Sequence, residues 1–329
     1  FEERRLDYVV KSEKSMWIPA NSDHIPLIQN AFEILQQNRA NSTVSYLAES
    51  GVLDFHRDRI IQKLENTSTQ SGINLFMSNQ SLLALIGVEK SPWHSRHFNV
   101  SYQKIQPFFC FASEPDQVGY LVNELTEYLA TPNTLYTMRI EAHHQALAYR
   151  LTQHGFTPVG TSIRLIREGE QSKCVDSISS NPYDSLIIRP CRNTDIPKLQ
   201  EVIRGSHRYS HFFCEQRFDP QRVRDLFAEW IAQCATNPAF EIRVAEQAGE
   251  IIGFCSAFIQ KSLKPYIQRS IGIIDFIVVD YRIQGKGIGR VLLEAAADWF
   301  RPDTDSIELR TMADNLQAIR FYEKNGFRM

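Results

Sequence analysis

The feature that most constrains this chain is a strand-like run followed at once by a glycine-rich turn and an amphipathic helix. Residues 271 to 279 are rich in Ile and Val and have the composition of a strand that is buried on both faces. Glycines follow at positions 285, 287 and 289, and apolar residues then recur at helical spacing from Val291 to Phe300. A helix start leaves backbone N–H groups unpaired at the positive end of the helix dipole, so this order predicts an anion site. Lys286 and Arg290 add positive charge there, and a diphosphate is the ligand that fits best.

The spacing of these glycines distinguishes the turn from two common phosphate-binding motifs. The dinucleotide-binding pattern is G-x-G-x-x-G, and the P-loop pattern is G-x-x-x-x-G-K-S/T. The chain has G-x-G-x-G with no Ser or Thr after Lys286, so neither pattern fits. The segment Gln284-x-x-Gly287-x-Gly289 instead resembles the coenzyme A pyrophosphate loop of the GCN5-related N-acetyltransferases, the GNAT family. A glycine-rich turn without a ligand is the alternative interpretation.

The C-terminal segment carries a second resemblance to the same family. Residues 306 to 311 alternate like a strand, and the segment ADNLQAIRFYEKNGF (313–327) follows them. This segment is similar to the closing N-x-x-A-x-x-x-Y-x-x-x-G-F segment of GNAT proteins. Two motifs in the family's order are more specific than either motif alone. The resemblance implies a GNAT fold, which is an α/β architecture on a mixed sheet, and acetyl-CoA as the co-substrate.

Length and composition suggest two domains and exclude several functions. The 329 residues, 43% of them hydrophobic, are enough for two domains that each bury a core. The 36 basic and 38 acidic residues give a net charge of −2, which offers no electrostatic argument for a nucleic-acid partner. The six cysteines form no C-x-x-C pair and no histidines have zinc-ligand spacing, so we expect reduced thiols, a cytoplasmic location and no metal. No run approaches 18 consecutive apolar residues, so no membrane span is expected. The chain begins with Phe1 rather than Met, which leaves open that it is a fragment.

Two segments of the chain also resemble each other. The segment AHHQALAYRLTQHGF (142–156) aligns without gaps on residues 313–327, at an offset of 313 − 142 = 171. The alignment places His144 opposite Asn315 and Leu151 opposite Tyr322, and no Q-x-x-G-x-G motif stands near the matching positions 113–116. We therefore predict a degenerate GNAT-like half that lacks the coenzyme A loop. A chance similarity between two helices ending in Gly-Phe is the alternative.

Changes in composition along the chain predict three segments. Residues 1–85 are predicted to be an N-terminal helical elaboration of unknown role, with helices near 25–35 and 55–64. Residues 86–175 are assigned to the degenerate half, and the serine-rich stretch 168–182 is the best candidate for a linker. Residues 183–329 are then the catalytic GNAT domain.

The resemblance implies roles for residues around the glycine turn. Tyr322 is at the family's general-acid position and is predicted to protonate the departing coenzyme A thiolate after direct attack by a neutral amine. Backbone amides at 277–279 are expected to polarise the thioester carbonyl and to pair with pantetheine, and Asn315 is expected either to bind the cofactor or to cap the last helix. The predicted cofactor-binding residues are Ile277, Val278, Val279, Gln284, Gly285, Lys286, Gly287, Ile288, Gly289, Arg290 and Asn315.

The acceptor is less constrained than the cofactor. Segments 93–98 and 207–231 are similar to sugar-nucleotide N-acetyltransferases of the dTDP-fucosamine (dTDP-4-amino-4,6-dideoxygalactose) type, although His94 stands where that family has an acidic residue. This resemblance implies the amino group of a nucleotide-linked sugar as the acceptor. Asp275 lies among apolar residues, where a carboxylate is costly without a partner, and is a candidate base or a group that orients the acceptor. The predicted acceptor-site residues are His207, Tyr209, His211, Phe212 and Asp275.

Two functional alternatives and the oligomeric state stay open at this point. The chemistry is retained if the acceptor is another small amine, an amino-acid-like thiol precursor or a protein N-terminus. A non-catalytic acyl-CoA sensor would need the glycine loop but not Tyr322. A homodimer is neither predicted nor excluded.

Overall fold

The computed structural model describes residues 16–40, 49–66, 72–169 and 186–329. Most of the predicted linker and Cys174 lie outside these residues. The chain forms two compact units, which we call the first unit (residues 1–95 and 100–157) and the second unit (residues 96–99 and 158–329). None of the helices in the described residues is long and apolar enough to cross a membrane.

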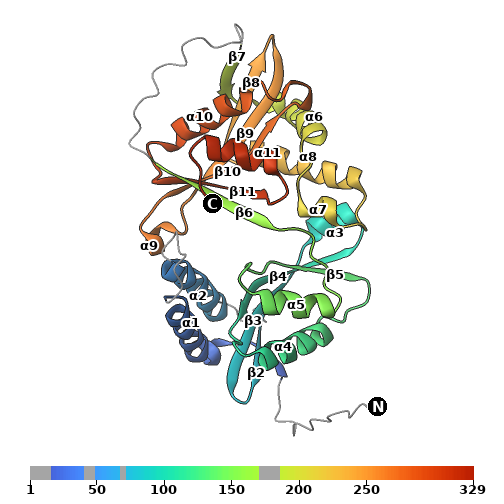
Figure 1. Cartoon of the computed structure of the whole chain (residues 1–329), viewed down its shortest axis with the longest axis vertical. Helices are drawn as coiled ribbons and strands as arrows, with labels where there is room; N and C mark the ends of the chain where they lie inside the picture. The colour runs from blue at the N-terminus through green and yellow to red at the C-terminus, as the bar shows by residue number, and fades with distance from the viewer. Residues whose placement is uncertain (1–15, 41–48, 67–71, 170–185) are drawn as a thin grey trace, which may run out of the picture. The chain divides into compact units, whose positions relative to one another are not determined.

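The first unit contains a mixed five-stranded sheet (Figure 1). Its order is β1-β2-β3-β4-β5, and only the β4–β5 pair is parallel. The strands are β1 (Met16–Pro19), β2 (Ile73–Ser78), β3 (Ser81–Lys90), β4 (Ser101–Cys110) and β5 (Thr134–Met138). The helices are α1 (Ile25–Ala40), α2 (Glu49–Glu65), α3 (Pro92–Phe98), α4 (Pro115–Tyr128) and α5 (Gln145–Gln153), and the last residues of α3 belong to the second unit.

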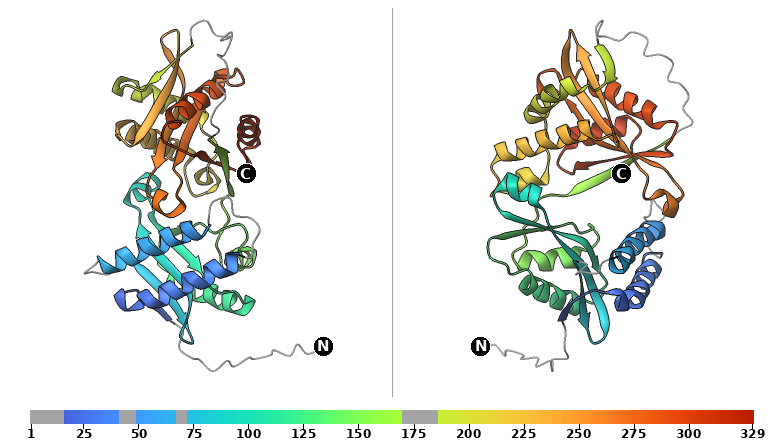
Figure 2. Two further views of the ribbon diagram at one scale, coloured as in Figure 1. Left: turned by 90° about the vertical axis from the view of Figure 1, so that its left-hand side faces the viewer. Right: turned by 180° about the vertical axis from the view of Figure 1, so that it is seen from behind.

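Both faces of the first sheet are covered by helices, because neighbouring strand residues point to opposite faces. Leu75 packs against α1 and α2 in one apolar cluster, and the next residue, Phe76, packs against α4 and α5 in another. The two layers of helices are visible in the turned views of Figure 2.

His94, where the sugar-nucleotide enzymes have an acidic residue, is buried and stacked on Tyr102.

The second unit contains a mixed six-stranded sheet of order β6-β11-β10-β9-β8-β7. The β10–β11 pair is parallel, and the other neighbouring pairs of this sheet are antiparallel. The strands are β6 (Ser162–Glu168), β7 (Leu186–Pro190), β8 (Phe240–Gln247), β9 (Glu250–Gln260), β10 (Ile271–Val279) and β11 (Ser306–Met312). The helices are α6 (Ile196–Ser206), α7 (His211–Cys214), α8 (Pro220–Thr236), α9 (Lys264–Ile267), α10 (Ile288–Phe300) and α11 (Leu316–Lys324).

The second sheet also separates two helical layers. Helices α10 and α11 pack with Ile274, Ile277 and Val279 in the main apolar core of this unit. The opposite face carries α6 and α8, where Phe276 meets the rings of Phe227 and Trp230. This arrangement is a mixed α/β fold, as the sequence analysis predicted.

The predicted internal repeat is present in the structure. The first unit runs β4, α4, β5, α5, and the second runs β10, α10, β11, α11, with a parallel strand pair in each. Helices α5 and α11 begin at residues 145 and 316, which differ by the 171 residues of the sequence alignment. The two halves are copies of one supersecondary unit.

The division of the chain differs from the predicted boundaries in two places. Strand β6, which the prediction assigned to the degenerate half, pairs along its whole length with β11 of the second sheet. Residues 1–85 are not a helical elaboration, because β1, β2 and part of β3 lie in one sheet with β4 and β5. The β2–β3 hairpin turns at Asn79 and Gln80, both at positive φ, which is the conformation that Asn-Gly usually supplies. Gln80 gives no such signal in the sequence.

Candidate active site

The glycine turn of the second unit follows β10 directly. Asp280 caps a short 3₁₀ turn, Tyr281–Ile283, by accepting a hydrogen bond from the Arg282 N–H, and it forms an ion pair with the Arg282 guanidinium. That guanidinium holds the pKa of the Asp280 carboxyl below its usual value. Gln284 then folds back, and its Nε2 donates to the Val279 carbonyl at 2.9 Å. These bonds fix the path of the chain from the strand to the helix.

Two glycines of the turn have conformations that favour glycine. Gly285 and Gly287 have φ of +81° and +85°, and no heavy atom lies within 4 Å of the position of an added Cβ at either residue. The turn is therefore exposed, and a ligand can reach its backbone. Gly289 differs, since a Cβ there would contact the ring of Phe321 at 3.5 Å.

The turn opens onto the first turn of α10. The amides of Gly287, Ile288 and Gly289 donate to no acceptor among the described residues. Because they stand at the positive end of a 13-residue helix, they form a site for an anion. Lys286 and Arg290 are exposed beside them. The predicted residues from Gln284 to Arg290 thus lie together in this turn and the first turn of α10.

Strand β10 loses its neighbour before it reaches this turn. Its pairing with β11 runs only from Ile271–Ser306 to Ile274–Leu309, whereas its pairing with β9 continues to Val279. Past Ile274, β10 therefore has an open edge. The Asp280 N–H donates to Ile252 on the β9 side, and by strand alternation the N–H groups of Val279 and Ile277 point to the open edge. The Val278 N–H points to β9, so two of the three predicted strand residues, Ile277 and Val279, offer amides to a ligand.

A β-bulge marks the place where the edge opens. Ile274 pairs with Ala257 and Phe276 pairs with Ser256, so Asp275 is the extra residue without a partner on β9. The bulge interrupts alternation, and Asp275 and Phe276 both face α8, with Cys234 and Trp230 respectively as neighbours. An acidic side chain is thereby directed to the face of the sheet opposite α10.

Asp275 is held in an environment that disfavours its charge. The Cys234 thiol donates to Oδ2 of Asp275 at 3.9 Å, and burial raises the pKa of this carboxyl to about 6. Burial and the nearby Asp275 carboxylate also raise the pKa of the Cys234 thiol, to about 12. Asp275 therefore titrates near neutral pH, as a general base requires.

Further buried polar groups lie on the same face. His207 follows the end of α6 and contacts the rings of Phe227 and Phe276, and its Nε2 atom has no hydrogen-bond partner among the described residues. Burial lowers its pKa to about 4, so the imidazole is neutral at pH 7. The hydroxyl of fully buried Ser256, which pairs with Phe276 across the strands, likewise makes no hydrogen bond of good geometry within the part of the chain that the structure describes, although it lies near the Cys234 thiol.

The other predicted acceptor residues differ from His207 in their burial and contacts. Phe212 is buried against Phe98, Phe218 and Phe227 and belongs to the core. Tyr209 is exposed, and His211 is half-buried with its ring against Phe212. The sequence analysis missed Cys234 and Ser256, because a cysteine in a helix and a serine in a strand carry no signal without the bulge that gathers them.

Tyr322 of α11 lies in the apolar core on the α10 face of the second sheet. Its ring packs between Phe321 and Phe327 in the core, with centroid separations of 5.1 and 5.7 Å. Burial, and then the nearby Cys255 thiol, raise the pKa of the Tyr322 phenol, and Cys255 pairs with Ile277 across β9 and β10. The phenol therefore stays protonated at neutral pH beside the strand whose edge is open.

Asn315 caps α11. Its Oδ1 accepts from the Ala318 N–H at 3.2 Å, and its Nδ2 donates to the Thr311 hydroxyl at 3.2 Å. Of the two roles left open by the sequence, the structure supports the helix cap. Asn315 thus fixes the start of the helix that carries Tyr322.

Comparisons with known proteins identify the class of this site. Residues 206–327 match the family described as "Acetyltransferase (GNAT) family". An L-amino acid N-acetyltransferase of Escherichia coli (strain K12) is 29% identical over 147 residues, which cover 43% of this chain and 82% of that protein. An aminoglycoside N(6')-acetyltransferase type 1 of Klebsiella pneumoniae is 24% identical over 162 residues, covering 46% and 78%.

Solved structures that are similar over both units include the following one. It is a tandem GNAT protein from the clavulanic acid biosynthesis pathway, 11% identical, with a TM-score of 0.51, covering 96% of this chain and 95% of that chain. The matched segment of this chain is thus similar to GNAT acetyltransferases, and the chain is an enzyme of the acyltransferase class. The more specific resemblance to dTDP-fucosamine acetyltransferases is not established by these comparisons.

Proposed function

We propose that this enzyme transfers the acetyl group of acetyl-CoA to a primary amine of a small molecule, in the site at the open edge of β10. The observation that carries the proposal is the continuous set of backbone donors in the second unit. It begins with the Ile277 and Val279 amides and ends with those of Gly287, Ile288 and Gly289. An extended pantetheine arm suits the strand edge, and a diphosphate suits the helix start.

The two faces of the sheet supply different groups to this edge. The α8 face offers Asp275, whose carboxylate accepts a proton from the acceptor's ammonium and leaves a neutral amine. The amine nitrogen then bonds to the thioester carbon, while an edge amide of β10 stabilises the charge on the carbonyl oxygen. When the carbon–sulfur bond breaks, the Tyr322 phenol on the α10 face protonates the thiolate, and the proton that the new amide nitrogen loses restores the phenol by way of solvent. Holding the amine and the thioester within reach contributes most of the rate.

For the acceptor we propose the amino group of a sugar, with a nucleotide-linked amino sugar as the first candidate. The resemblance of segments 93–98 and 207–231 to sugar-nucleotide enzymes supports it, and exposed Tyr209 offers a ring face for a sugar. Aminoglycosides and L-amino acids are the second candidates, because the two relatives described above act on them. Half-buried Asp275 suits a cationic group in each of these ligands.

A panel assay separates these candidates. Thiol release from acetyl-CoA is measured with dTDP-amino sugars, aminoglycosides, L-amino acids, polyamines and a peptide with a free N-terminus. We expect the highest kcat/KM with a dTDP-amino sugar, and a higher value with another class reassigns the acceptor. Thermal stabilisation by acetyl-CoA without turnover on any amine would instead favour the non-catalytic sensor.

Asp275→Asn is expected to remove the base and to relieve a destabilising charge. We expect kcat/KM to fall by about two orders of magnitude and its rise through about pH 6 to disappear. Folding raises the pKa of Asp275. Between about pH 4 and pH 6 the carboxyl therefore ionises in the unfolded chain but stays protonated in the folded protein, and the free energy of unfolding falls as the pH rises. Above about pH 6 the folded carboxyl ionises too, and this loss of stability stops growing. The free energy of unfolding of the Asn variant should therefore exceed that of the wild type by up to about 3 kcal/mol at pH 8.

Two measurements check this expectation. Chemical unfolding at pH 4 and pH 8 should show the difference only at pH 8. Asp225→Asn, on the same face of the unit but exposed in an ion pair with Arg204, is the control and should leave the pH profile of kcat/KM unchanged. An ascending limb near pH 6 that survives in Asp275→Asn excludes Asp275 as the base.

A further inference from the structure

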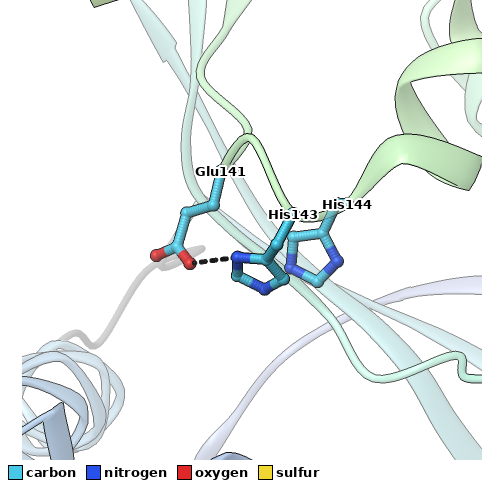
Figure 3. A group of neighbouring side chains, drawn as sticks. All are labelled: Glu141, His143 and His144. Atoms are coloured by element: carbon cyan, nitrogen blue, oxygen red, sulfur yellow. Dashed lines mark ion pairs between the residues drawn. The ribbon is translucent and has the colours of Figure 1, made fainter. Parts of the chain in front are cut away.

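In the first unit, a turn at the start of α5 gathers three side chains that are common metal ligands. Glu141, His143 and His144 each offer one ligand atom, and these atoms all lie within 4.8 Å of one another. The His144 N–H donates to the Glu141 carbonyl at 3.0 Å, which closes the turn. Figure 3 shows the Glu141 carboxylate directed at His143, with the two imidazole rings side by side. Their centroids are 4.1 Å apart.

The same turn occurs in the second unit with different side chains. There the Asn315 N–H donates to the Met312 carbonyl, also at 3.0 Å, and the offset of 171 residues places Met312, Asp314 and Asn315 opposite Glu141, His143 and His144. Asn315 caps α11 with its side chain, whereas His144 makes no side-chain cap hydrogen bond to α5. The backbone of the turn is thus shared by the two halves, and only the first half places two imidazoles and a carboxylate on it.

We propose that Glu141, His143 and His144 bind a divalent transition-metal ion, with Zn²⁺ as the preferred ion. Two imidazoles and one carboxylate are a common donor set for zinc, with ligand distances of about 2.0–2.2 Å. In a tetrahedral site with these metal–ligand distances, two ligand atoms lie about 3.4 Å apart. The distance from His143 Nδ1 to Glu141 Oε2 is 3.3 Å, so this pair already has the required separation. Rotation of side chains brings the third ligand to the same distance, because Glu141 and His143 are exposed.

No metal is expected from the sequence, because no histidines have the spacing of a zinc motif. Here the ligands are at positions i, i+2 and i+3 of a turn, and the folded backbone rather than a motif brings them together. With three protein ligands the site leaves a coordination position for water or for an external ligand. Metal bound here would tie Glu141 to the start of α5 and stabilise the first unit.

Zinc binding to the full-length chain tests the proposal. The protein is purified without a polyhistidine tag, stripped with a chelator and titrated with Zn²⁺ by calorimetry and equilibrium dialysis. We expect one ion per chain, and at least about tenfold weaker binding in each of His143→Ala and His144→Ala. Glu141→Gln should weaken binding in the same direction. His154→Ala, at the other end of α5, is the matched control and should bind like the wild type.

Cobalt gives a second readout that separates this site from the cysteines. Co²⁺ at the proposed site should show visible d–d bands that His143→Ala abolishes, without the near-ultraviolet charge-transfer band of a thiolate ligand. Absence of binding, binding without a stoichiometric plateau, or binding that all three substitutions leave unchanged would each overturn the proposal. Thermal unfolding in the absence of metal shows that each variant is folded.

Discussion

Replacing Tyr322 by phenylalanine is expected to lower kcat at least about tenfold while the Kd for acetyl-CoA changes by less than about twofold. The phenol lies in the core that α11 forms with Ile277 of β10, and its raised pKa keeps it protonated at the pH of the assay. Phenylalanine keeps the ring contacts with Phe321 and Phe327 and removes only the hydroxyl. The loss should therefore appear in the chemical step and not in binding. Single-turnover kinetics together with calorimetric binding of acetyl-CoA measure the two separately.

A structural role for Tyr322 makes a different prediction. If the hydroxyl served only packing, the variant would lose thermal stability and retain its kcat at temperatures where it is folded. Tyr149→Phe is the control, because Tyr149 is exposed on α5 of the first unit, and it should retain the kcat of the wild type. A Tyr322→Phe enzyme with unchanged kcat would remove the general-acid assignment.

Replacing Gly287 by valine is expected to raise the Kd for acetyl-CoA at least about tenfold. Gly287 has a φ of +85°, where a β-branched residue is strained by about 1–3 kcal/mol. The chain relieves this strain by moving the turn, and the amides of Gly287, Ile288 and Gly289 then no longer converge on one anion. The effect should fall on the diphosphate of the cofactor, so the affinity for 3′-dephospho-CoA should fall by the same factor. Calorimetry with both ligands measures it.

Gly249→Val provides a matched control for strain. Gly249 lies in the β8–β9 hairpin of the same unit, has a φ of +81° and, like Gly287, has no heavy atom near an added Cβ. Both variants should lose similar thermal stability, but only Gly287→Val should lose affinity for acetyl-CoA. Equal affinities in the two variants would show that the turn does not hold the cofactor.

The parts of the fold that depend on local pattern could be predicted from the sequence. The strand at 271–279 and the helices α1 and α10 could be expected within about five residues of their bounds, because each carries a clear pattern of apolar residues. The 171-residue repeat was also visible, since α5 and α11 both keep their apolar face and end in Gly-Phe.

The parts that depend on pairing between distant segments could not be predicted. Nothing in the sequence of β10 indicates a bulge at Asp275, because the bulge exists only in register with Ala257 and Ser256 of β9. The positions of Cys234 at Asp275 and of His207 and Ser256 at Phe276 depend on that register as well. The pairing of β6 with β11 is equally invisible, since an alternating strand does not specify its neighbour.

The position of β6 also determines where this chain can be divided. Strand β6 precedes the serine-rich segment, yet it completes the second sheet along all seven residues of β11. A fragment that begins after residue 183 would leave β11 with unpaired donors and acceptors, and exposed edges of this kind recruit strands from other molecules. Excision of the acetyltransferase half should therefore start near residue 158, where the longer segment of the second unit begins, so that β6 is retained and the fragment remains monodisperse.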